Sequence, residues 1–171
     1  MRQLTLNEQM EIARFGNFEE RYLLSKEKKL FPEVIDYLAC HEEYDVIRSV
    51  LAKRSDIWSS SLDKMARKEI HDAVLEGIAF NLNTDADTLD YLAEIGLFNV
   101  EYGVASNPNT RKDRLALLAK SSHHKIQNAV LLNPNTSKEV REEIRMKNKG
   151  VHFDAMSWYD YHDISMEIND D

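Results

Sequence analysis

The sequence predicts an all-α fold, a solenoid of stacked helical repeats, from two observations. Asn-Leu-Asn-Thr at 81–84 is followed by Asn-Pro-Asn-Thr at 107–110 and again at 133–136, so one tetrapeptide pattern returns twice at a constant interval. Small and apolar residues recur at the same interval on both sides of it. A constant period of this length is typical of a solenoid, in which each unit buries its apolar face against its neighbours.

Each unit is predicted to contain two helices. The first helix has equivalent apolar positions at Val74, Val100 and Ile126. The second helix follows the tetrapeptide and repeats an apolar set at spacings i, i+3 and i+4, which marks one face of a helix. This set consists of Leu89, Leu92 and Ala93 in one copy and of Leu115, Leu118 and Ala119 in the next.

Two weaker copies precede the three clear ones, at slightly longer offsets. In this alignment Leu62 matches Leu89, and Val50 falls near Ile78. We therefore expect about five two-helix units of roughly 26 to 28 residues, at 15–42, 43–70, 71–96, 97–122 and 123–148. The first is the weakest, as expected for an end unit that caps the stack. The helical-repeat domain is assigned to residues 1–150, and a separate acidic, aromatic tail or cap to residues 151–171.

The tetrapeptide is predicted to start the second helix of each unit. Thr84, Thr110 and Thr136 are each followed three residues later by an acidic residue, which is the spacing of a capping box. In such a box the threonine hydroxyl accepts a hydrogen bond from a free amide of the first turn, which stabilises the helix end by about 1 kcal/mol. Pro108 and Pro134 are expected to stop the preceding helix, and the asparagines to bond nearby backbone in the turn.

These residues resemble a known repeat family. The pattern Val-x-x-x-Val-Ala-x-Asn-Pro-Asn-Thr, followed by Leu-x-x-Leu-Ala, is similar to the leucine-rich repeat variant, and residues 100–119 match it best. The unit at 71–96 has Leu82 in place of the proline, and the last unit has Arg141 where Leu115 stands. The resemblance implies a right-handed superhelix of alternating α and 3₁₀ or short α helices, related in appearance to HEAT and armadillo solenoids. It implies no activity.

No cofactor or metal is expected. The founding type of this family carries an iron–sulfur cluster on a cysteine-rich segment, whereas this chain has one cysteine, Cys40, which is predicted to be buried on an apolar helix face. Adjacent histidines on a helix point about 100° apart, and no paired cysteines support a zinc site. The metal ligands weighed and rejected are His123, His124, His152 and Asp154.

The net charge of −8 is unevenly distributed. Residues 103–150 contain ten basic and four acidic residues, while 151–171 contain six acidic and no basic ones. Lys112 and Lys138 occupy equivalent repeat positions, so stacking is expected to align them in a basic row, and such asymmetry indicates an interaction surface. The candidate partner-binding residues are Arg111, Lys112, Arg114, Lys120, His123, His124, Lys125, Lys138 and Arg141, together with Trp158 and Tyr161 of the tail.

Three interpretations of the tail stay open. Its apolar side chains cap the open end of the last unit, or its acids lie along the basic units and compete with an anionic partner. Alternatively, Trp158 and Tyr161 anchor another protein, since such side chains dominate interface energetics.

The expected function is that of a non-enzymatic scaffold that binds a protein or peptide partner on its curved surface. The chain lacks phosphate-loop, dinucleotide-binding, zinc-protease and serine-hydrolase motifs. It has no membrane-spanning run of ~20 apolar residues and no secretory signal, so a cytoplasmic location is expected. The alternative is nucleic-acid binding through residues 103–150, with the tail regulating access. An enzyme similar to the HEAT-like alkylpurine DNA glycosylases would need an aromatic-lined cleft with an essential acid, which no stretch shows.

Overall fold

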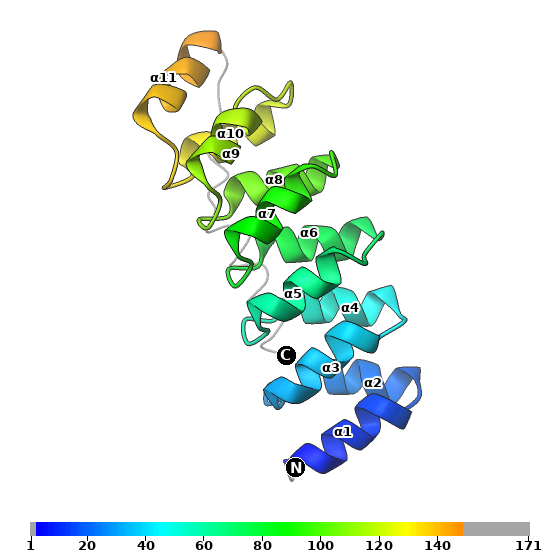
Figure 1. Ribbon diagram of the computed structural model, residues 1–171. Helices are drawn as coiled ribbons and strands as arrows, with labels where there is room; N and C mark the ends of the chain where they lie inside the picture. Colours follow the sequence, from blue (N-terminus) through cyan, green and yellow to red (C-terminus); the bar gives the residue numbers. More distant parts are fainter. Residues whose placement is uncertain (1–2, 149–171) are drawn as a thin grey trace. The chain divides into compact units, whose positions relative to one another are not determined.

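The computed structural model describes residues 3–148, and within this range every regular element is an α-helix (Figure 1). The predicted all-α fold is confirmed. The tail at 151–171, with Trp158 and Tyr161, lies outside the described residues, so its three interpretations stay predictions. The chain divides into two compact units, an N-terminal unit of residues 1–84 and a C-terminal unit of residues 85–171, which are described in turn.

The N-terminal unit arranges its helices in two layers (Figure 1). One layer packs α1 against α3 and α3 against α5, and the other packs α2 against α4 and α4 against α6. The helices are α1 (Leu6–Phe15), α2 (Phe18–Ser25), α3 (Pro32–His41), α4 (Asp45–Ala52), α5 (Ser59–Ala66) and α6 (Asp72–Phe80). Each helix therefore packs against the next but one in sequence, as expected when two-helix repeats stack side by side.

In the C-terminal unit the next-but-one packing is seen between α8 and α10, and the other pairs are neighbours in sequence. Helix α8 packs against α10, while α7 and α9 pack against α8, and α9 and α11 pack against α10. The helices are α7 (Ala86–Ala93), α8 (Phe98–Ser106), α9 (Lys112–Leu118), α10 (His124–Leu132) and α11 (Lys138–Lys147). Each of the five segments predicted from the sequence thus contains two helices, and α1 precedes the first of these pairs.

The apolar core uses the predicted repeat positions with one correction. The equivalent residues Val74, Val100 and Ile126 are fully buried. The buried counterpart of Ile78 is Leu51, because Val50 is only half-buried, so the predicted alignment of that helix was one residue off. Small residues recur next to the buried position of Ile78 because the helices approach closely there.

That close approach is visible at Gly77, where α6 meets α4. A Cβ atom at Gly77 would lie 3.1 Å from the Cβ of Ala52. The prediction for Cys40 was wrong: its side chain is only partly buried, because it lies beside the exposed Lys64 ammonium at the edge of the helix face.

The predicted capping boxes at the three threonines are not formed. Their hydroxyls instead donate to the carbonyl six residues earlier, near the end of the preceding helix, in the pairs Thr84–Ile78, Thr110–Val104 and Thr136–Val130. The amides of the following helices are capped by Asp85 in α7 and Ser137 in α11, and α9 has no side-chain cap. The tetrapeptide therefore closes the preceding helix, whose last carbonyls have no partners within the helix.

The first asparagine of the tetrapeptide ties consecutive repeats together. The side-chain amide of Asn81 donates to the carbonyls of Ala52 and Arg54 at 2.7 and 2.8 Å, and its oxygen accepts from the amide of Asn83 at 2.9 Å. Asn133 repeats this pattern in the C-terminal unit, donating to Ala105 and Asn107 at 2.8 Å each. A buried asparagine with three hydrogen bonds to backbone is a structural element of the repeat.

In the degenerate repeat at 43–70, Arg54 takes the place of the asparagine. Its Nη1 donates to the carbonyls of Ser25 and Glu27 at 2.8 and 2.9 Å, which lie 29 and 27 residues earlier. Asn81 uses the same two separations. The inter-repeat bond is therefore kept although the residue that makes it has changed.

Candidate functional site

Two of the arginines predicted to bind a partner are paired with acids of their own unit. Arg111 forms ion pairs with Asp87 and Asp90 of α7. Arg114 pairs with Asp90 at 3.1 Å and with Glu94 at 3.2 Å. The guanidinium groups of Arg111 and Arg114 therefore already face carboxylates, and the surface they share with α7 is of mixed charge.

Arg141 closes the end of α10. Its guanidinium donates to the carbonyls of Leu131, Asn133 and Thr136. The carbonyls of Leu131 and Asn133 are the equivalents, in the next repeat, of the carbonyls of Ala105 and Asn107, which accept from the Asn133 side chain. Arg141 thus makes the bonds that the asparagine of a further repeat would make, and this explains why it replaces the leucine of the other repeats.

The remaining candidates of the C-terminal unit lie on its surface. Lys120, His123, His124 and Lys125 are exposed where α9 connects to α10. The His123 ring packs edge-on against Phe98, with ring centroids 4.9 Å apart. Lys112 and Lys138 are also exposed, and Lys138 lies 4.0 Å from Glu142. Among the predicted residues that the structure describes, those that stay basic and exposed are therefore Lys112, Lys138 and the local group at 120–125.

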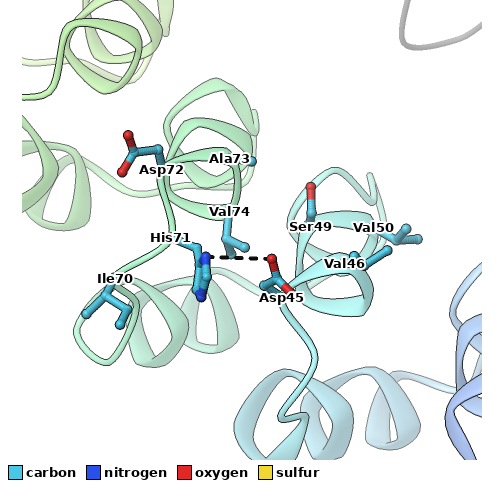
Figure 2. Close-up of a pocket in the computed structure, with 9 residues that line it drawn as sticks. All are labelled: Asp45, Val46, Ser49, Val50, Ile70, His71, Asp72, Ala73 and Val74. Atoms are coloured by element: carbon cyan, nitrogen blue, oxygen red, sulfur yellow. Dashed lines mark ion pairs between the residues drawn. The ribbon is translucent and has the colours of Figure 1, made fainter.

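A different feature stands out in the N-terminal unit. A shallow hollow of about 550 Å³ lies between the start of α4 and the start of α6 (Figure 2). The apolar part of its lining comes from Val46 and Val50 of α4, Ala73 and Val74 of α6, and Ile70 in the turn before α6. Ile70 is 82% exposed and Val46 49% exposed, so large apolar side chains border the hollow without being covered.

Polar groups occupy the mouth of the hollow. His71 reaches from the start of α6 toward α4, with its Nδ1 atom 3.6 Å from the carboxylate of Asp45 (Figure 2). Asp72 and Ser49 complete the lining. Asp45 and Asp72 are the first residues of their helices, where the helix dipole stabilises a negative charge.

Exposed aromatic rings continue this surface onto α2. The Tyr44 ring, at the N-cap of α4, meets the Phe18 ring edge-on with centroids 4.9 Å apart. Phe18 in turn stacks on Tyr22 at 5.9 Å. The Arg21 guanidinium lies over the Tyr44 ring at 5.5 Å. We call the exposed side chains Phe18, Tyr44, Val46 and Ile70 the apolar strip.

Buried ion pairs hold both ends of the apolar strip in place. Glu69 pairs with Arg48 at 2.6 Å, and its other oxygen accepts from the amides of Ile70 and His71 at 2.9 and 3.0 Å. Burial acts to raise the pKa of Glu69, but the hydrogen bonds from Arg48 and from these amides outweigh it and lower the pKa. The charged carboxylate therefore fixes the turn that presents Ile70.

The same arrangement holds Tyr44. Glu42 pairs with Arg21 at 2.9 Å and accepts from the amide of Tyr44 at 3.0 Å. Its side chain is fully buried, like that of Glu69, which is 2% exposed. The two pairs recur at one constant offset, from Arg21 to Arg48 and from Glu42 to Glu69. This recurrence is a sequence signal for the site that the tetrapeptide pattern alone does not reveal.

The described residues offer no metal-binding or membrane-spanning element. Within residues 3–148 no group of three or more His, Cys, Asp or Glu side chains is placed to hold a metal ion. None of the helices in that range is long and apolar enough to cross a bilayer. No protein-family model, curated protein or solved structure matches the chain. The similarity to the leucine-rich repeat variant stays a prediction.

Proposed function

We propose that the protein is a non-enzymatic helical-repeat scaffold whose N-terminal unit binds a protein or peptide partner. The apolar strip carries this proposal, because its side chains remain exposed on α2, at the start of α4 and in the turn before α6. Two of them, Val46 and Ile70, also border the hollow. A group of exposed large apolar side chains is typical of an interaction site. Tyr44 and Phe18 add exposed aromatic rings, and aromatic side chains are among those that dominate binding energies at interfaces.

The strip is also pre-organised. The buried pairs Arg21–Glu42 and Arg48–Glu69 bond to the backbone at Tyr44 and Ile70. A surface whose backbone is fixed before binding loses less conformational entropy when the partner docks.

Nucleic-acid binding by residues 103–150 is the weaker proposal. Phosphates bind through lysines and arginines that are available to them. Arg111 and Arg114 face carboxylates, and Arg141 is bonded to backbone carbonyls. Lys112, Lys120 and Lys125 remain exposed, and a local group of this size supports weak, salt-sensitive binding at most.

The scaffold proposal includes the right-handed solenoid of five repeats predicted from the sequence. Its support is the recurrence of the same inter-repeat bonds at Arg54, Asn81 and Asn133. Equivalent bonds at equivalent positions are what a repeating stack requires.

Site-specific photo-crosslinking in the cells that make the protein tests the proposal. A photoreactive phenylalanine analogue at Val46 is expected to yield a discrete protein adduct. The same analogue at Leu117, which is similarly exposed but lies on α9 in the C-terminal unit, serves as the matched control. Equal labelling at both positions, or adducts with nucleic acid only, would contradict the proposal.

A further inference from the structure

We infer that the hollow between α4 and α6 receives an apolar side chain of a partner segment that carries a lysine or arginine beside it. This inference rests on the proposed function and specifies the chemistry of the partner. Its support is the lining of the hollow and the charges that surround it.

The lining of the hollow includes accessible apolar side chains. Val46 and Val50 come from α4, and Ile70 and Ala73 come from the turn before α6 and its first residues, while Val74 lies fully buried beneath them. The hollow is shallow, so its volume of about 550 Å³ offers an open surface on which a partner side chain can lie. An aliphatic side chain is the group that such a lining favours, since burying it removes apolar surface from water on both partners.

The charges at the mouth are acidic. Asp45 and Asp72 line the hollow, and among the described residues the only other ionisable group in the lining is His71. An ammonium or guanidinium group placed beside the apolar side chain would meet these carboxylates, and a phosphate or carboxylate would be repelled.

The nearby arginines are already paired with other carboxylates, while Asp45 also faces His71 and acts through its charge on Arg48. The guanidinium of Arg48 is paired with Glu69, and that of Arg21 with Glu42 and Glu43. Lys53 lies at the other end of α4. There its positive charge partly offsets the burial that raises the pKa of Glu76. The carboxylates that line the hollow therefore disfavour acidic partners, including nucleic acid.

The inference is tested by amide NMR titrations of the full chain with two capped peptides, Ac-Ala-Leu-Lys-Leu-Ala-NH₂ and Ac-Ala-Leu-Glu-Leu-Ala-NH₂. The lysine peptide is expected to bind at millimolar concentrations and to shift the amides of residues 45–50 and 70–74. The glutamate peptide is expected to bind about fivefold more weakly, the size of effect that one or two exposed charge pairs produce.

Two variants show whether the hollow is responsible. Val46→Glu changes an exposed side chain, so the fold is retained, and it should abolish the shifts. Asp45→Asn should reduce the preference between the two peptides while leaving the apolar contact. Equal affinity for both peptides, shifts located elsewhere, or no shifts at all would overturn the inference. If any of these results were obtained while a protein partner still crosslinked at Val46, the proposed function would stand. Only the inferred chemistry of the partner segment would then be refuted.

Discussion

Replacing Asn133 by alanine should destabilise the C-terminal unit by about 3 kcal/mol. Asn133 is 2% exposed. It donates to the carbonyls of Ala105 and Asn107 at 2.8 Å each and accepts from the amide of Asn135 at 2.9 Å. Each of these bonds contributes about 1 kcal/mol net, and the groups left behind are largely buried, so the loss lies between about 2 and 4 kcal/mol.

Urea unfolding followed by far-UV circular dichroism measures this change. A lower midpoint at an unchanged slope indicates a loss of stability without a change in the surface exposed on unfolding. Asn99→Ala is the matched control, because Asn99 is exposed on α8 of the same unit, and its effect should stay within about 0.5 kcal/mol. If Asn133→Ala were as mild as the control, the inter-repeat tie would have no energetic role and our account of the tetrapeptide would be refuted.

Three further predictions concern residues that hold the repeats and the apolar strip. Arg54→Ala should lower the free energy of unfolding by about 2 kcal/mol, since it removes the hydrogen bonds to Ser25 and Glu27. Arg54→Asn should recover part of this loss in the same urea assay. If Arg54→Asn were no more stable than Arg54→Ala, arginine at this position would not be equivalent to the asparagine of the other repeats. Glu69→Gln should cost about 2 kcal/mol at neutral pH. Because the folded-state pKa of Glu69 is lowered, its charge stabilises the fold above about pH 4.5, and this contribution is lost as the pH falls through the folded-state pKa. Thermal melts from neutral to acid pH should therefore bring the two proteins together at low pH; a constant difference would show that the charge of Glu69 is not responsible. Arg141→Ala should speed amide hydrogen exchange in α10 and α11 while α8 keeps its protection, and uniform loss across the unit would mean that Arg141 does not act as a local closure.

The all-α fold was readable from the sequence because its helices carry periodic apolar positions. Val74, Val100 and Ile126 recur at a fixed offset and are all buried, since each repeat packs its neighbours in the same way. The direction of local bonds was not readable. The threonine spacing fits a capping box equally well, and only the backbone shows that Thr110 turns inward to bond Val104.

The apolar strip could not be predicted from the same pattern. Val46, Ile70 and Tyr44 all lie in the degenerate copy at 43–70. An apolar residue in or beside a short helix is taken as core until its exposure is known. The charge pattern of the sequence also gave a misleading prediction of the basic surface. Arg111 and Arg114 stood out as a basic cluster, but their acidic partners lie earlier in the chain, on α7 and at its end, and only packing brings them together.

The central claim is that the apolar strip binds a protein partner. Its most direct test is the dissociation constant for the partner that crosslinks at Val46, measured with both proteins purified. We predict that the double variant Val46→Glu, Ile70→Glu binds that partner at least about tenfold more weakly than the wild type, as expected when central apolar anchors are lost. The control variant Leu117→Glu should bind as tightly as the wild type. Unchanged affinity in the double variant would show that the apolar strip is not the binding surface.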